Sequence, residues 1–423
     1  MHKFLLLIIV SIVLSACTAA RLPQVKRQIT AELEREQYSE QFTGLLVIDP
    51  QTKDTIIAKN SAKYFIPAST VKLFTLYAAN KLLSDKIPSL NYVESNDSLY
   101  IKGTGDPTWL HPYFKDSTAL SFLKNTPKPV VLYLDNFEDG PFGPGWAWED
   151  YQYYFSPELG PMPLYGNVVT IYEGETLEVS PSDFAKHIKR SKPTALRALH
   201  RNEFTIPKFL KDTLQIPFIT SPELTKKFLQ KSLKREIYLS KKTSNEPYKV
   251  LYGISTDSLF KRMLYESDNF IAEQLMLLAS SSLSDSLSFK NTRNFILDNH
   301  LSNLRQEPRW VDGSGLSRYN LFTPESMVSV LHKLYAEIDR QRLFDLLPAW
   351  NSNGTVKKPN STTEYFIFAK SGSMGNTYNL SGYLKTKSGR IFIFSFMNNH
   401  FRIPSKEVRL QIEKTLTSLH DAY

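Results

Sequence analysis

The chain has 423 residues, of which 42% are hydrophobic and 22% are charged, a composition typical of a globular protein with two domains or one domain with a large insertion. The formal net charge of +9 is not concentrated in one run, so it indicates no nucleic acid as a partner, although it permits an anionic polymer such as cell wall. The sequence has no zinc-type Cys/His cluster, no P-loop and no G-x-G-x-x-G motif, so we expect neither a metal nor a cofactor.

Residues 1–16 have the pattern of a signal peptide. Lys3 precedes an apolar run from Phe4 to Leu14, which is too short for a permanent membrane span. The junction Leu14-Ser15-Ala16-Cys17 resembles a bacterial lipobox, which implies cleavage before Cys17 and lipidation of that residue. We therefore expect an exported protein that faces the periplasm and touches the membrane only through this lipid. Thr18, not an aspartate, follows the cysteine, which favours the outer membrane. An ordinary buried thiol is the alternative reading.

A short tether, residues 17–23, leads into the first folded elements. A surface helix is expected over residues 21–37, with apolar residues at a spacing of four. Phe42–Ile48 and Thr55–Ala58 predict two strands of a hairpin.

The stretch from Pro67 to Ala79 predicts a buried helix that begins at or just before Ser69. Ser69 and Lys72 are three residues apart, so their side chains share one face of the first turn. A lysine on an otherwise apolar helix is desolvated, which favours its neutral amine and makes it a general base for a serine nucleophile. A capping serine and a lysine that extends from a core helix are the alternative.

After Asn91 the pattern changes to short strands and turns rich in Gly, Pro and aromatic residues. We expect an inserted β-rich domain over residues 91–249, with strands at Ser98–Lys102, Val130–Leu134 and Val168–Tyr172. The aromatic stretch from Pro141 to Tyr165 is expected mainly to form the packed core of this insertion, and a carbohydrate-stacking surface is the alternative.

From Leu259 the chain is predicted to be helical again. Two apolar helices, Leu259–Leu264 and Phe270–Leu278, are joined by a short segment that contains Ser267-Asp268-Asn269. This segment can be a rigidly held catalytic loop or a plain turn capped by Asp268 or Asn269. After a glycine-punctuated loop, Thr323-Pro324-Glu325 predicts the start of another helix.

The remainder of the chain predicts an antiparallel sheet and a closing helix. The expected strands are Tyr365–Ala369, which ends in Lys370-Ser371-Gly372, then Leu380–Lys385 and Arg390–Met397, joined by a turn at Thr386–Gly389. Residues 404–420 predict an amphipathic helix beside the N-terminal helix, with apolar positions at Val408, Leu410, Ile412 and Leu416.

Three short motifs occur in the order typical of penicillin-recognising serine enzymes: Ser69-x-x-Lys72, Ser267-Asp268-Asn269 and Lys370-Ser371-Gly372. A second S-x-x-K at Ser121 is followed at once by Pro127, so it cannot begin a long buried helix. A second Lys-Ser-Gly at Lys387 lies in the predicted hairpin turn. The first copies therefore have the better structural settings.

The resemblance extends beyond these motifs. Gly103-Thr104-Gly105-Asp106-Pro107, Gly145–Asp150, Asp312–Ser317 and Ala369–Ser373 resemble the D-alanyl-D-alanine carboxypeptidase/endopeptidase family, the low-molecular-mass class C penicillin-binding proteins. The resemblance covers nearly the whole mature chain and implies an α/β (α+β) penicillin-binding, β-lactamase-like transpeptidase fold. In such a fold an antiparallel sheet is flanked by helices, with a helical subdomain. The peptidase domain would comprise residues 24–90 and 250–423.

The resemblance also implies residue roles in acyl transfer to Ser69 from peptidoglycan stem peptides, with β-lactams as covalent inhibitors. Catalytic roles fall to Ser69, Lys72, Ser267, Asn269 and Lys370, and substrate-binding roles to Asp268, Ser371, Gly372 and Ser373. The backbone N–H groups of Ser69 and Ser373 would form the oxyanion hole. Ser371 stands where threonine is more usual in the family, but it keeps the hydroxyl.

Three other functions stay open at this point, of which an esterase on the same scaffold is the remotest. A serine β-lactamase uses the same three motifs, and a non-catalytic cell-wall-binding lipoprotein could keep the fold without activity. The sequence does not separate carboxypeptidase from endopeptidase activity.

Overall fold

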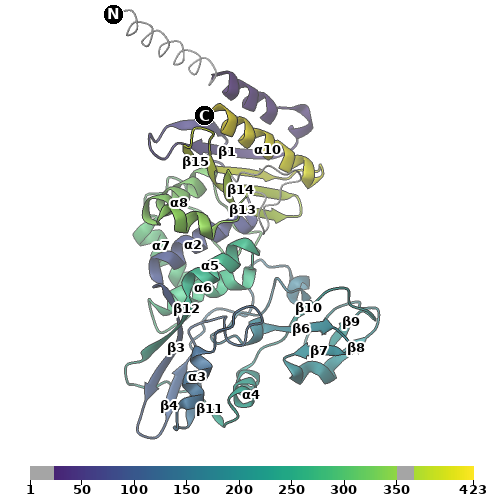
Figure 1. The fold of residues 1–423 in the computed structure, drawn as a ribbon, viewed down its shortest axis with the longest axis vertical. Coiled ribbons are helices and arrows are strands. Elements are labelled where there is room, and N and C mark those ends of the chain that lie inside the picture. The colour runs from purple at the N-terminus through teal and green to yellow at the C-terminus, as the bar shows by residue number, and fades with distance from the viewer. Residues whose placement is uncertain (1–22, 350–365) are drawn as a thin grey trace, which may run out of the picture. The chain divides into compact units, whose positions relative to one another are not determined.

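The computed structural model describes residues 23–349 and 366–423, which form two compact units (Figure 1). The first unit contains the described residues up to Leu73, together with Leu304–Arg309 and Asn320–Tyr423. The second unit contains Phe74–Asn303 and Trp310–Tyr319. Cys17 and the expected strand start at Tyr365 lie outside the described residues.

The first unit is built on a five-stranded antiparallel sheet in the order β13-β14-β15-β1-β2. Its strands are β1 (Phe42–Ile48), β2 (Thr55–Lys59), β13 (Ile367–Met374), β14 (Thr377–Lys385) and β15 (Ile391–Asn399). The predicted hairpin of β1 and β2 and the predicted pairing of β14 with β15 are confirmed. The sheet brings the two ends of the chain together, because β15 pairs with β1.

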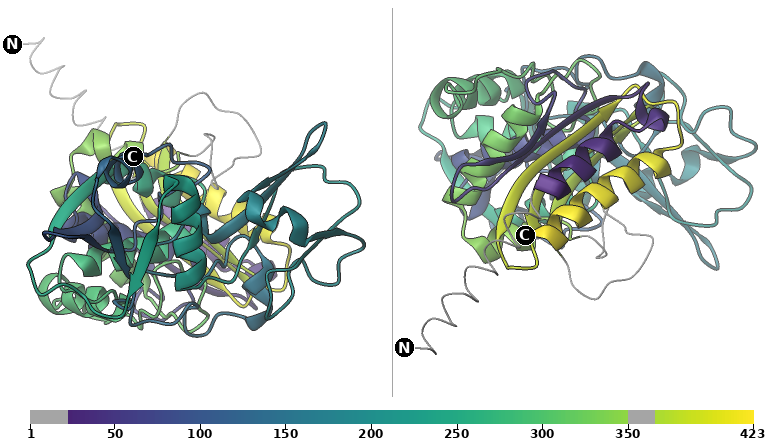
Figure 2. Two further views of the ribbon diagram at one scale, coloured as in Figure 1. Left: turned by 90° about the horizontal axis from the view of Figure 1, so that it is seen from below. Right: turned by 90° about the horizontal axis from the view of Figure 1, so that it is seen from above.

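Helices cover both faces of this sheet. On one face the helix over residues 23–33 lies beside α10 (Ser405–Ala422), as the right view of Figure 2 shows. Alternate residues of β14 and β15, such as Leu380 and Phe394, join these two helices in one core. On the other face, α8 (Pro324–Glu337) accepts a hydrogen bond from Tyr383 at the carbonyl of Leu331, 2.8 Å away.

The helix predictions hold for this unit with one exception. Thr323 caps α8, and its side chain accepts from Ser326 N as the sequence pattern indicates. Val408, Ile412 and Leu416 are buried, but Leu410 is exposed. Leu410 was wrongly placed on the buried face of α10, since it is only two residues from Val408 and Ile412 and so lies on another side of the helix. The short helix α9 (Arg340–Leu346) follows α8.

The second unit contains a helical part and the inserted segment. The helical part comprises most of α2 (Lys72–Leu82) with α5 (Thr256–Tyr265), α6 (Asn269–Ser281) and α7 (Phe289–His300). The predicted pair of helices around Ser267 is therefore confirmed as α5 and α6. Every residue of α6 from Phe270 to Ser280 is buried.

The inserted segment forms a mixed five-stranded sheet in the order β11-β5-β4-β3-β12. Its strands are β3 (Lys86–Glu94), β4 (Leu99–Lys102), β5 (Val130–Tyr133), β11 (Ile237–Ser240) and β12 (Lys249–Ser255). Because β3 pairs with β12, this sheet extends slightly beyond the expected limits at 91 and 249. Whether these residues form a separate domain stays a prediction.

Two smaller sheets and two helices complete the inserted segment. The sheets are β10-β6-β7, with β6 (Val168–Glu173), β7 (Leu177–Ser180) and β10 (Leu214–Pro217), and the pair β8 (Ile188–Arg190) and β9 (Phe204–Ile206). The helices α3 (Thr118–Asn125) and α4 (Pro222–Leu233) contribute Leu123, Phe228 and Leu229 to a core shared with these strands.

Candidate active site

Ser69 lies on a 3-10 turn, Ala68–Val71, that leads directly into α2. Lys72, the first residue of α2, is fully buried, and its Nζ donates to Ser69 Oγ at 2.9 Å. The predicted pairing of these two side chains is therefore present, although the helix expected to start at or just before Ser69 begins as a 3-10 turn. A 3-10 turn still brings residues three apart to the same side, because it has three residues per turn.

Backbone strain precedes the serine. Ala68 has φ 47°, a left-handed conformation that is uncommon for a residue with a Cβ. Such strain is held only where the surrounding structure fixes the backbone, and it is frequent at functional sites. The strained residue gives the chain a sharp change of direction just before Ser69.

The third motif lies inside β13. Lys370, Ser371 and Gly372 pair with Ser381, Leu380 and Asn379 of β14, and the strand continues to Met374. The strand was expected to end in this motif, but it continues beyond it to Met374, because β14 offers partners along the motif and past it. Ser373 is exposed on the same strand.

Gly372 allows β13 to lie directly against the turn that carries Ser69. A Cβ at Gly372 would lie 2.6 Å from Pro67 O and 2.9 Å from the backbone nitrogens of Ser69 and Thr70. Any larger residue would push these backbones apart. The glycine of the motif is therefore required for the approach of the strand to the serine.

Lys370 is the second buried cation beside Ser69. Burial is the main cause that lowers its pKa well below the usual range, and the positive charge of Lys72 lowers this pKa further. Its Nζ donates to Ser371 O at 2.8 Å. Since two ammonium groups in one buried site repel each other, the site favours one charged and one neutral lysine.

Two buried asparagines, which the sequence did not reveal, hold the segment before Ser69. Asn379 Nδ2 donates to Ile66 O at 2.9 Å and to Pro67 O at 2.7 Å, while Asn379 Oδ1 accepts from Asn398 N at 3.0 Å. Asn399 Oδ1 accepts from Ile66 N at 2.6 Å. Neither asparagine belongs to a recognised motif, so the sequence alone gave no signal for them.

The second motif lies in the other unit, between α5 and α6. Ser267 has φ 56°, again left-handed. Asp268 caps α6 by accepting from Ile271 N at 3.1 Å, and its other oxygen accepts from Arg262 Nε at 3.0 Å. The capping role considered for Asp268 is therefore confirmed, and its role in substrate binding stays a prediction. Asn269 Nδ2 donates to Phe155 O at 3.1 Å.

Two buried acids organise the glycine-punctuated loop that follows α7. Glu273 accepts from Gly313 N at 2.9 Å and from Ser314 N at 2.8 Å. Asp312 accepts from Gly315 N and from Trp146 Nε1, each at 2.9 Å. Burial, followed by the charge of Asp312, raises the pKa of Glu273 from 4.5 to about 8. Glu273 is therefore a structural acid that binds this loop to α6.

The second copies of two motifs occupy exposed positions. Ser121 and Lys124 are exposed on the short helix α3. Lys387 lies in the turn between β14 and β15, where its Nζ pairs with Asp421 at 2.7 Å. Neither copy has the buried lysine that a general base requires, which supports the choice of Ser69, Lys72 and Lys370.

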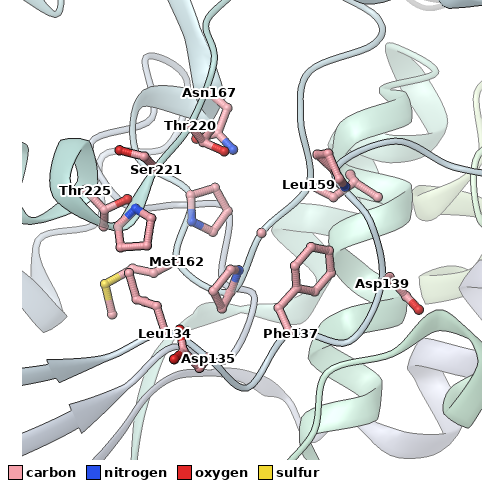
Figure 3. A pocket seen from close by; sticks show the side chains of 15 residues that line it. Leu134, Asp135, Phe137, Asp139, Leu159, Met162, Asn167, Thr220, Ser221 and Thr225 are labelled. Carbon is pink, nitrogen blue, oxygen red and sulfur yellow. The ribbon is translucent and has the colours of Figure 1, made fainter. Parts of the chain in front are cut away.

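A cavity of about 480 Å³ lies in the second unit, within the inserted segment (Figure 3). It is lined mainly by apolar side chains, including Leu134, Phe137 and Met162, together with the start of α4, and no residue of the three motifs lines it. Within the described ranges, no three His, Cys, Asp or Glu side chains are grouped as a metal site would require. In that same part of the chain, no helix combines the length and hydropathy needed to cross a bilayer.

Comparison with known proteins gives a consistent result. The family model of the D-Ala-D-Ala carboxypeptidase 3 (S13) family matches residues 25–198 and 220–422. The chain is 22% identical over 424 residues to the D-alanyl-D-alanine carboxypeptidase DacB of Haemophilus influenzae, covering 84% of this chain and 85% of the relative. It is 25% identical over 183 residues to a D-alanyl-D-alanine carboxypeptidase of an Actinomadura species, covering 40% of this chain and 32% of the relative.

Solved structures show the same fold. The crystal structure of penicillin binding protein 4 of Haemophilus influenzae superposes with a TM-score of 0.72 at 21% identity, covering 93% of this chain and 99% of that one. A predatory peptidoglycan endopeptidase of Bdellovibrio bacteriovorus superposes with a TM-score of 0.51 at 17% identity, covering 89% of this chain and 93% of that one. The predicted fold class is confirmed.

The contacts of Asn379 predict a positioning role that can be measured. Asn379→Ala removes its two hydrogen bonds to the carbonyls of Ile66 and Pro67, each worth about 0.5–1.5 kcal/mol, and loosens the turn before Ser69. We expect the rate of covalent labelling by a fluorescent penicillin to fall about tenfold or more, measured under conditions where the variant is fully folded.

The matched control is Asn398→Ala. Asn398 is equally buried in the same sheet, and its side chain accepts from Thr43 rather than holding the segment before Ser69. Both variants should lose stability, but only Asn379→Ala should label slowly. Equal labelling rates for the two variants would contradict the positioning role.

The pKa of Glu273 predicts a specific pH dependence of stability. The folded chain retains a proton that the unfolded chain releases between about pH 4.5 and pH 8, so this contribution is fully present below pH 4.5 and is lost as the pH rises through 8. Relative to Glu273→Gln, the wild type should lose at most about 1.4 kcal/mol of unfolding free energy for each pH unit in this window.

Guanidinium unfolding at a series of pH values measures this difference, with the exposed Glu223→Gln as the control. The control should follow the wild-type pH dependence. A difference between wild type and Glu273→Gln that stays constant from pH 4.5 to 8 would show that Glu273 does not titrate in this range.

Proposed function

The chain belongs to the D-Ala-D-Ala carboxypeptidase 3 (S13) family of serine hydrolases that act on peptidoglycan, and we propose that Ser69 is its nucleophile. The observation that carries this proposal is the hydrogen bond of 2.9 Å between Lys72 Nζ and Ser69 Oγ, with Lys72 fully buried. A neutral amine at this position accepts the hydroxyl proton while Oγ attacks the carbonyl carbon of a terminal D-Ala-D-Ala bond.

Lys370 and Ser371 are suited to hold the carboxylate at the end of the stem peptide. The lowered pKa of Lys370 reflects the cost of a buried charge, and an incoming carboxylate compensates this charge. The Ser371 hydroxyl can donate a further hydrogen bond to this carboxylate, and the bond is stronger because its acceptor is charged. In this proposal Gly372 lets β13 lie close to the turn that carries Ser69. The backbone N–H groups of Ser69 and Ser373 bind the oxyanion.

The leaving D-Ala nitrogen must gain a proton when the C–N bond breaks. We assign this proton transfer to Ser267, with supporting roles for Asn269 and Lys370, on the basis of the order of the three motifs in the sequence. Water then attacks the ester on Ser69, the peptide leaves with a new carboxylate, and the proton returns to the Ser69 oxygen.

Carboxypeptidase and endopeptidase activity differ only in what occupies the leaving side of the bond. The Haemophilus influenzae relative is named as a carboxypeptidase, and the Bdellovibrio bacteriovorus structure is described as a peptidoglycan endopeptidase. The Haemophilus influenzae protein has also been crystallised with a β-lactam. We propose that this chain cleaves D-Ala-D-Ala bonds in stem peptides, in cross-links or in both, and that β-lactams acylate Ser69.

β-Lactamase activity is less suitable for this chain than cleavage of D-Ala-D-Ala bonds. Class A β-lactamases clear their acyl-enzyme with a glutamate that activates water, located in an E-x-x-L-N run between the second and third motifs. No glutamate between Ser267 and Lys370 begins such a run, and both oxygens of Glu273 accept from the loop at Gly313 and Ser314. We therefore expect the penicilloyl ester to persist.

Digestion of purified peptidoglycan tests the proposed activity. The wild-type chain should release D-Ala, split cross-linked muropeptides, or do both, and mass analysis of the products distinguishes the two reactions. Ser69→Ala should reduce product formation by at least about a thousandfold, because it removes the nucleophile. Ser121→Ala should retain the wild-type rate, since Ser121 is an exposed residue of α3. Full activity of Ser69→Ala would disprove the assignment of the nucleophile.

The lipid anchor is a separate proposal. We propose that Cys17, which lies outside the described residues, becomes the lipidated N-terminus and holds the protein at the outer membrane, facing the periplasm. Its support is the junction Leu14-Ser15-Ala16-Cys17 after a short apolar run. Cys17→Ser should move the protein from the membrane fraction to the soluble fraction, whereas Thr18→Ser should not. A Cys17→Ser protein that still fractionates with membranes would contradict the anchor.

A further inference from the structure

Residues 186–211 form a strongly basic part of the inserted segment. They contain eight lysine and arginine residues but only one acidic residue, Glu203, whereas the whole chain has a net charge of +9. The expectation that the charge is not concentrated in one run is therefore wrong for these residues. A surface with this balance attracts anionic partners. Five of its lysines are exposed: Lys186, Lys189, Lys192, Lys208 and Lys211.

Strand pairing brings two of the basic stretches together. Because β8 and β9 are parallel, the residues that follow each strand leave the pair at the same end. Ser191 N donates to Ile206 O at 3.0 Å at this end, so Lys192 lies near the start of the loop over residues 207–212. This loop falls between the two ranges that the family model matches, 25–198 and 220–422, so it is not among the features that define the family.

The loop carries Phe209, which is 82% exposed and is the most exposed large hydrophobic side chain of the described residues. Trp148 and Tyr154 are also exposed, so the expectation that residues 141–165 mainly form a packed core is confirmed for Tyr151 but wrong for these two. Trp and Tyr rings carry a polar atom that water can solvate, whereas a phenyl ring has none. The exposure of Phe209 therefore indicates an apolar partner.

The backbone on both sides of Phe209 is fixed. The guanidinium of Arg190 donates to the carbonyl of Lys208 and, through Nη2, to Glu173 Oε1 at 2.8 Å. Glu173 Oε2 accepts from Leu210 N at 2.7 Å. The loop therefore presents the phenyl ring without the entropic cost of ordering a mobile segment when a partner binds.

The lysines beside Phe209 distinguish between possible partners. Lys208 and Lys211 flank the ring, and the nearest acid in the sequence is Asp212. An anionic bilayer satisfies both features, because the ring can enter the boundary between headgroups and acyl chains while the ammonium groups reach lipid phosphates. Protein–protein interfaces are instead depleted of lysine, and a soluble polyanion offers no apolar phase for the ring.

We propose that the loop over residues 207–212, together with the lysines around it, binds the surface of an anionic phospholipid bilayer with Phe209 inserted. The proposal does not rest on the proposed function, because no residue of the three motifs takes part. It adds a second membrane contact to the one expected through a lipid at Cys17. A contact through one ring and a few lysines is reversible and salt-sensitive, so it would not by itself hold the chain on salt-washed membranes.

Lysine footprinting of the full chain tests this contact. The chain is mixed with vesicles of phosphatidylcholine, with or without phosphatidylglycerol, and the acetylation rate of each lysine is followed by mass spectrometry. Phosphatidylglycerol should slow acetylation of Lys208 and Lys211 about fivefold or more, and high salt should reverse this protection. The exposed Lys63 and Lys261 serve as reference sites and should react at the same rate throughout. A lipid at Cys17 would tether the chain to both kinds of vesicle, so the comparison isolates lipid charge.

Substitution of Phe209 tests the role of the ring. Phe209→Ala should raise the vesicle concentration needed for half-maximal protection about tenfold, since it removes the inserting group. Phe209→Trp should stay within about twofold of wild type, because tryptophan also prefers the membrane interface. The matched control is Tyr238→Ala, which removes a ring that is 53% exposed on β11 and should leave the protection unchanged.

A second pair of variants tests the charge. Lys189→Gln/Lys192→Gln should raise the half-protecting vesicle concentration about tenfold or more, since each lysine near an anionic surface adds to the attraction. Lys124→Gln/Lys290→Gln removes the same charge from exposed helix positions and should stay within about twofold of wild type. All these variants should keep the wild-type rate of penicillin labelling, which shows that they are folded.

Several results would overturn the proposal: equal protection by both kinds of vesicle, wild-type protection of Phe209→Ala, or equal slowing at Lys63 and Lys261. Protection of Lys208 and Lys211 by soluble polyphosphate, but not by vesicles, would also overturn it and favour an anionic polymer. Failure of penicillin to label Ser69 in the wild type would count against the proposed function and would leave the footprinting result unaffected.

Discussion

The hydrogen bond from buried Lys72 to Ser69 is the interaction on which the rest of the site depends. It exists because an apolar helix excludes water from a lysine on its first turn and because a 3-10 turn aligns residues three apart. The residues around this hydrogen bond keep Ser69 in position. Asn379 and Asn399 hold the backbone before Ser69, and Gly372 lets β13 lie against the turn without a side chain between them. The sheet is thus a rigid support for one hydroxyl group.

A second buried lysine, Lys370, affects the charge state of this arrangement. Lys370 is as deeply buried as Lys72, and its pKa is lowered first by burial and then by the charge of Lys72. Two buried amines of this kind disfavour two simultaneous positive charges. In the proposed mechanism, a substrate carboxylate favours the protonated form of Lys370 and leaves Lys72 as the base. Recognition of a chain-terminal carboxylate and activation of Ser69 are coupled in this account.

Sequence alone predicted the elements with strong patterns and missed those that depend on tertiary contacts. The apolar helices around Ser69 and Ser267 and the strands β14 and β15 follow from local periodicity, and the three motifs follow from their spacing. The extension of β13 beyond Gly372 depends on its pairing with β14, and the role of Asn379 depends on a distant loop, so neither has a local signal. The exposure of Trp148 was missed because hydrophobicity does not reveal whether a loop-rich segment packs inward.

The central claim is a stable acyl-enzyme at Ser69, and the most direct test is the intact mass of the protein over time after a single addition of penicillin G. The account predicts one adduct per chain, located by peptide mapping on the peptide that contains Ser69. The adduct should persist for minutes or longer, because no glutamate between Ser267 and Lys370 begins an E-x-x-L-N run. An adduct on another residue would contradict the assignment of Ser69. An adduct that forms and disappears within seconds while free penicilloate accumulates would identify the protein as a β-lactamase.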